Sequence, residues 1–111
     1  MSQADDATPS AHYTRFAKKH PAIAEAHAKL GEAVRAAGPL TEREIALVKL
    51  ALAVGAHTEG GVHAHARRAH AAGVERAAIE QVTLLAAPTL GFPHTMAAYS
   101  WLTDTLDDLD P

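Results

Sequence analysis

The chain contains no cysteine among its 111 residues. This absence excludes a disulfide framework, a cysteine-ligated metal site and any thiol mechanism. The sequence also has no run of eighteen apolar residues, and its basic clusters do not exceed pairs such as Lys18-Lys19 and Arg67-Arg68. We therefore expect no membrane-spanning helix and no nucleic-acid-binding face, since a nucleic-acid face needs an extended set of cations.

Large apolar side chains are scarce. The chain has two Phe, two Tyr and one Trp, whereas 26 residues are alanine. Alanine favours helices and lets them approach closely, but it buries little apolar area. A core of this kind gains stability when subunits share apolar faces, so we expect a homo-oligomer. The polar, acidic N-terminal stretch is unlike a signal peptide, and the expected location is the cytoplasm.

The apolar residues recur at helical spacing, and no strand-like alternation is present. We predict a flexible tail at 1–9 and a single all-α domain of five to six helices at 10–111. Ser10 is expected to cap a helix to about residue 20, and Pro21 to open the next. The segment "TERE" at 41–44 is a capping box, and it starts an apolar helix that should be the most buried and close at Gly55.

The second half of the chain predicts three further helices. The first, from about residue 59, ends at Gly73, a position suited to a left-handed cap. The second, at 74–90, should turn Ile79 and Leu85 inward and be kinked or ended by Pro88. The last starts at about residue 93 after the "GFP" turn, and its acidic end should fray.

The segment "GAHTEGGVHAHARRAHAAG" at 55–73 holds four of the eight histidines. At 100° per residue, Glu59 and His63 share a helix face, whereas His65 points about 200° away from His63. Glu59 and His63 form a metal-binding pair, an acid–base pair or a solvated surface pair. His65 lies on an alanine-lined face, where it is either a satisfied core residue or a proton carrier.

A metal site would need ligands beyond Glu59 and His63. His57 and His94 are candidates, supplied by a neighbouring element or subunit. Imidazole and carboxylate donors suit a divalent ion such as zinc, nickel or iron. The metal would then activate a water molecule or tie subunits together.

Several spacings agree across residues 38–100: the "RE" helix start at 43–44, His65 followed by Ala69 and Gly73, a helix containing Glu80, and the "GFP" turn at 91–93. This pattern resembles the superfamily of carboxymuconolactone decarboxylases and AhpD-like alkylhydroperoxidases. The resemblance implies an all-helical subunit that assembles as trimers or hexamers. It also implies a site between helices near a subunit boundary, without a required cofactor.

The same resemblance assigns roles to individual positions. His65 matches the family's proton-carrying histidine, and Glu44 matches the relay carboxylate. The peroxidase branch places a cysteine pair at the positions of Thr58 and Gly61, so the absence of cysteine excludes a thiol peroxidase and marks a divergent member. The decarboxylase branch needs no thiol, because carbon dioxide is lost from a lactone acid and a histidine protonates the resulting dienolate carbon.

The leading hypothesis is therefore a small enzyme that performs acid–base chemistry on a small organic molecule. His65 would carry the proton, with Glu44 and the Glu59–His63 pair tuning or sharing it. The site motif itself offers no arginine for a dicarboxylate, because the two arginines at 67–68 lie beyond the histidines. The alternatives are a divalent-metal-binding protein that uses Glu59 and His63, and a helical oligomer without catalytic activity.

Overall fold

The computed structural model describes residues 10–111, and in this part of the chain it contains six helices and no strand. The all-α prediction is confirmed, while the predicted tail at 1–9 lies outside the described residues. No helix in this part is long and apolar enough to cross a membrane. The helices are α2 (Ala11–Lys19), α3 (Pro21–Ala36), α4 (Glu42–Ala56), α5 (Glu59–Ala71), α6 (Arg76–Leu90) and α7 (Phe92–Leu109).

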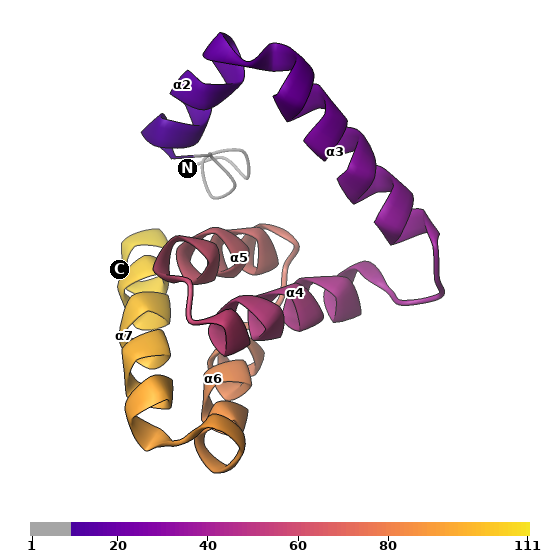
Figure 1. Ribbon diagram of the computed structural model, residues 1–111. Coiled ribbons are helices and arrows are strands. Elements are labelled where there is room, and N and C mark those ends of the chain that lie inside the picture. The colour runs from indigo at the N-terminus through magenta and orange to yellow at the C-terminus, as the bar shows by residue number, and fades with distance from the viewer. Residues whose placement is uncertain (1–9) are drawn as a thin grey trace.

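The last four helices pack together into a body (Figure 1). Helix α5 lies against α4 and α7, and α6 packs on α7 and α4. Small residues at the crossing points, including Ala66, Ala69 and Ala98, are fully buried and let the helices approach closely. The large buried side chains are few, as the composition indicated; those with no exposed surface among the apolar core are Leu50, Val62, Ile79 and Leu102.

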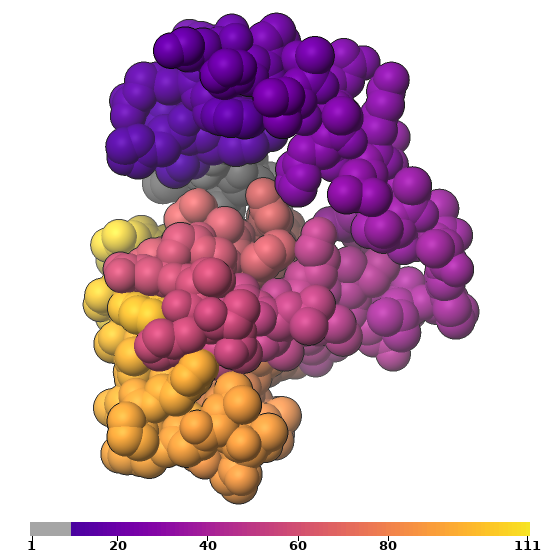
Figure 2. All heavy atoms as spheres, in the orientation of Figure 1, coloured from indigo at the N-terminus to yellow at the C-terminus, as the bar shows by residue number. Residues whose placement is uncertain are grey.

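The first two helices form an arm, defined as α2 and α3, that stands off the body (Figures 1 and 2). Neither helix has a buried residue, and α3 packs substantially only on α2. The radius of gyration is 14.3 Å, compared with about 13 Å for a compact chain of this length. The helices of the arm thus depend on local helix-forming and capping residues, and the hydrophobic core does not stabilise them.

Most predicted helix ends are confirmed. The Ser10 hydroxyl accepts from the backbone N–H of Tyr13, and Pro21 occupies the first turn of α3. Both bonds of the capping box are present in α4. Gly73 adopts a φ of 84°, as a left-handed helix end requires. The predicted end at Gly55 was wrong by one residue, because α4 runs to Ala56 and His57 adopts the left-handed conformation after it.

Burial of the apolar helices differs from the prediction in two places. Helix α4 is not the most buried, since Val48 and Leu52 on its outer side are 46% and 67% exposed, whereas α7 buries more residues than α4 does. Leu85, expected to face inward, is 61% exposed. Both differences have the same physical reason. Apolar residues occupy more of the circumference of these helices than the other helices of the chain can pack against.

The last two helices continue through the positions where an end or fraying was predicted. Helix α6 continues past Pro88 to Leu90. The end of α7 stays helical to Leu109, because Asp107 and Asp110 near its end pair with Arg76 and His70 at 2.7 and 3.2 Å. A proline removes one backbone hydrogen bond, but it does not end a helix whose sides are packed. Ion pairs near a helix end oppose fraying.

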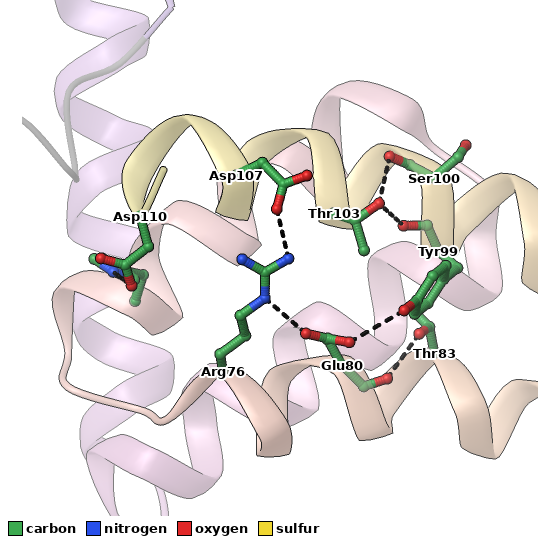
Figure 3. Close-up of polar contacts among 9 residues, drawn as sticks. Arg76, Glu80, Thr83, Tyr99, Ser100, Thr103, Asp107 and Asp110 are labelled. Carbon is green, nitrogen blue, oxygen red and sulfur yellow. Dashed lines mark hydrogen bonds and ion pairs between the residues drawn. The ribbon is translucent and has the colours of Figure 1, made fainter.

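A polar network reinforces the contact between α6 and α7 (Figure 3). Arg76 donates from Nε to Glu80 at 2.7 Å and from its terminal nitrogen to Asp107 at 2.7 Å. The Tyr99 hydroxyl donates to the other Glu80 oxygen at 3.2 Å. Because the single guanidinium of Arg76 bonds a carboxylate on each helix, the network ties α6 to α7.

Candidate functional site

His65 lies in a cavity between the end of the arm and the body. Its helix, α5, presents it toward α4, on the opposite side from His63, as the 200° separation predicted. The cavity has a volume of about 140 Å³. Its lining comes from three helices and the start of the following turn: Arg35, Glu42, Ala46, Lys49, His65, Arg68 and Ala72.

The electrostatics of this cavity keep His65 neutral. Burial and, after it, the positive charges of Arg68, Lys49 and Arg35 together lower the pKa of the imidazole from 6.5 to about 4. Each cation disfavours a second positive charge on the imidazole. His65 is therefore a free base at neutral pH, able to accept a proton.

Three cations and one carboxylate surround that base. Burial lowers the pKa of the Lys49 ammonium, and the neighbouring Arg35 and Arg68 lower it as well, as expected where like charges converge. Glu42 offsets the positive charge of Arg35, with which it forms an ion pair at 3.1 Å. The remaining excess of positive charge makes the cavity suited to an anion.

The expectation that no arginine would serve the site was wrong. Arg68 lies one helical turn after His65 at the i+3 position, so both side chains reach the same cavity. Arg35 comes from the end of α3, a helix outside the histidine segment. Sequence reasoning also missed Glu42 and Lys49. The available signal was Lys49 itself, a single charge within the apolar run "IALVKLALAV".

Glu44 does not line this cavity. Its carboxylate accepts from the Thr41 backbone N–H at 2.8 Å, and its own N–H donates to the Thr41 hydroxyl at 3.1 Å. The bonds to Thr41 lower the pKa of the Glu44 carboxyl. Glu42 and Glu44 are separated by about 200° around the helix, so only Glu42 shares the face of Ala46 and the cavity.

Glu59 and His63 form a pair on the other side of α5. The Glu59 Oε2 and His63 Nε2 atoms lie 3.4 Å apart. The second ring nitrogen of His63 forms a short hydrogen bond with the Thr105 hydroxyl on α7. This pair is brought together as the spacing predicted, but the two residues are not among those that line the His65 cavity.

The other histidines do not complete a metal site within one chain. The rings of His57 and His94 contact each other at a tilt, with centroids 4.0 Å apart, and His57 also contacts Trp101. His94 Nε2 donates to the Val54 carbonyl at 2.7 Å. Within residues 10–111, no three or more His, Asp and Glu side chains are grouped to hold a metal ion. A metal at Glu59 and His63 would thus need ligands from outside residues 10–111 of the same chain.

The positions that carry cysteines in the peroxidase branch are occupied by residues that fit each other closely. The Thr58 hydroxyl donates to the Ala53 carbonyl at 3.4 Å. A Cβ atom at Gly61 would lie 2.5 Å from the Thr58 Oγ1 atom. A side chain at position 61 is therefore incompatible with this arrangement of Thr58.

Comparison with known proteins identifies the family of the chain. The model of the carboxymuconolactone decarboxylase family matches residues 21–104, which include α3 and all but the end of the body. Searches of curated proteins and of solved structures give no match. Because the family match covers well over half of the sequence, the chain belongs to the carboxymuconolactone decarboxylase family.

Proposed function

We propose that this protein is an enzyme that performs acid–base chemistry on a small organic acid, with His65 as the proton carrier. The observation that supports this most strongly is the cavity in which a neutral imidazole is surrounded by Arg35, Lys49 and Arg68. A substrate carboxylate would bind to these cations by charge-assisted hydrogen bonds. The substrate carbon next to it would then lie within reach of the imidazole.

Binding of the anion changes the proton affinity of His65. The three cations disfavour the imidazolium, and a bound carboxylate offsets their charge, so the pKa of His65 rises when substrate is present. The imidazole is then able to hold a proton and deliver it to carbon. In a decarboxylation, the carbon–carboxylate bond breaks, its electron pair remains on the substrate as a dienolate, and His65 supplies the proton that forms the new C–H bond.

The test is turnover of lactone acids and enol acids by matched variants. His65→Asn is expected to lower kcat by about 10²-fold or more, the usual contribution of a proton-transferring group. His27→Asn is the control, since this histidine is exposed on α3 and does not line the cavity. Arg68→Gln is expected to raise KM more than it lowers kcat, because it removes binding of the carboxylate. Equal turnover by wild type and His65→Asn would refute the assignment.

A second candidate function is a divalent-metal site at Glu59 and His63, with zinc, nickel or iron as the ion. One observation favours it: the hydrogen bond from His63 to Thr105 orients the ring, as outer partners do for metal-binding histidines. The site would be completed by ligands from another subunit. Elemental analysis of untagged protein is expected to show metal that Glu59→Ala and His63→Ala both lose; metal retained by both variants would exclude this site.

We also propose that the protein acts as a homo-oligomer in the cytoplasm. The family resemblance implies trimers or hexamers, and the exposed apolar residues of α3 and α4 support an assembly. A helical oligomer with no activity is the remaining alternative. It predicts no turnover and no binding of small carboxylates by wild type.

A further inference from the structure

Lys49 differs from the other lysines of the chain in its surroundings. The sequence contains four lysines, at positions 18, 19, 29 and 49. The first three are exposed, whereas Lys49 is partly buried in the lining of the His65 cavity. It stands within the apolar run of α4, where an aliphatic side chain would avoid the cost of removing an ammonium group from water. The packing of α4 does not by itself require a lysine at this position.

No carboxylate neutralises the Lys49 ammonium group. Within residues 10–111 Lys49 forms no ion pair. The carboxylate that lines the same cavity, Glu42, pairs with Arg35 instead. Burial lowers the pKa of Lys49, and the charges of Arg35 and Arg68 lower it as well. A lowered pKa leaves a larger share of the amine unprotonated at neutral pH, and the unprotonated amine is the nucleophilic form.

Two helix faces bring this amine to the same cavity as His65. Glu42, Ala46 and Lys49 lie four and three residues apart along α4, so they share one face. His65 and Arg68 lie three residues apart on α5 and share the face that also lines the cavity. Arg68, like Lys49, forms no ion pair within the described residues, so its guanidinium is available to a carboxylate. The cavity thus combines an amine, an imidazole and a guanidinium.

We propose that Lys49 is a nucleophile that captures the keto group of a short 3-oxo acid as an iminium, while the carboxylate of the acid binds to Arg68. This assignment rests on the proposed function, because it names the substrate class for the proton transfer by His65. A 3-oxo acid suits the three groups of the cavity, since one carbon separates its keto group from its carboxylate. The cavity volume of about 140 Å³ is close to the roughly 150 Å³ of a cavity that binds benzene, and acetoacetate is similar in size to benzene.

The iminium provides an acceptor for the electron pair that decarboxylation leaves on carbon. The Lys49 amine attacks the keto carbon, and water leaves with uptake of one proton to give the iminium. The bond between the carboxylate and its carbon then breaks, carbon dioxide leaves, and the electron pair neutralises the iminium to form an enamine. The His65 imidazolium protonates the enamine carbon. Water hydrolyses the resulting iminium and releases a ketone, one proton and the free amine. The net reaction consumes one proton, which His65 regains from solvent.

Borohydride trapping with acetoacetate tests for the iminium. At neutral pH, wild type is expected to gain the mass of one isopropyl group, which is the reduced adduct after decarboxylation, and peptide mapping should place it on Lys49. Lys49→Arg keeps the positive charge but removes the amine, so it should not be labelled. Lys29→Arg is the matched control, because Lys29 is exposed and pairs with Glu25 at 3.4 Å. It should be labelled like wild type. Absent labelling, or labelling spread evenly over the exposed lysines, would overturn the proposal.

Turnover of acetoacetate separates this proposal from the assignment of His65. Lys49→Arg is expected to lose turnover down to the rate of the uncatalysed reaction, with unchanged helical circular dichroism. If Lys49→Arg retains turnover and His65→Asn loses it, the role of Lys49 is refuted and that of His65 stands. If Lys49 is labelled and His65→Asn turns over like wild type, the proton carrier is wrong and the capture by Lys49 stands.

Discussion

The low pKa of His65 has a measurable effect on stability. In the folded chain this pKa is about 4, compared with 6.5 for an unperturbed histidine. Between these values the unfolded chain binds a proton that the folded chain does not. The associated stability is therefore fully present above pH 6.5 and is lost as the pH falls toward 4.

The magnitude follows from the size of the shift. A pKa lowered from 6.5 to about 4 corresponds to about 3.4 kcal/mol. Because the imidazole is only half-buried, solvent screens part of this interaction, and we expect about 1–2 kcal/mol. Urea unfolding at pH 7.5 and pH 4.5 measures it. Wild type should lose about 1–2 kcal/mol more free energy of unfolding between these values than His65→Gln does.

Nuclear magnetic resonance measures the pKa of His65 directly. The His65 ring signal, identified by its absence from His65→Gln, should titrate near pH 4. Arg68→Gln should raise this pKa only partly, since burial is its largest cause and the charge of Arg68 comes second. A His65 signal that titrates near 6.5, or identical pH dependence in wild type and His65→Gln, would refute the electrostatic description of the cavity.

Three further predictions concern stability and are measured by urea unfolding. Thr41→Ala removes the hydroxyl that accepts from the Glu44 N–H and should cost about 1 kcal/mol; an unchanged midpoint would contradict a role for the cap. Leu102→Ala leaves a cavity at a fully buried position and should cost about 2–5 kcal/mol, whereas a loss below that range would mean that the core collapses around it. Gly61→Ala places a Cβ atom 2.5 Å from the Thr58 Oγ1 atom and should cost about 1–3 kcal/mol; adding Thr58→Ala should recover part of the loss, and no recovery would locate the strain elsewhere.

Local features of this protein are readable from the sequence because they depend on residues close together in the chain. The capping box at Thr41 and Glu44 and the positive φ at Gly73 each follow from interactions within a few residues. The opposite directions of His63 and His65 follow from helix geometry alone. The all-α class and the family were accessible for the same reason, since periodicity and motif spacing are properties of the linear chain.

The composition of the site depended on tertiary structure. The packing of α4 decides that Glu42 and not Glu44 faces His65, because the two carboxylates point about 200° apart and either could have faced α5. Arg35 reaches the cavity from a helix thirty residues earlier in the chain, and no local pattern indicates that contact. The charges that lower the pKa of His65 thus come together only when three helices meet. No pattern in the linear sequence indicates which side chains will meet there.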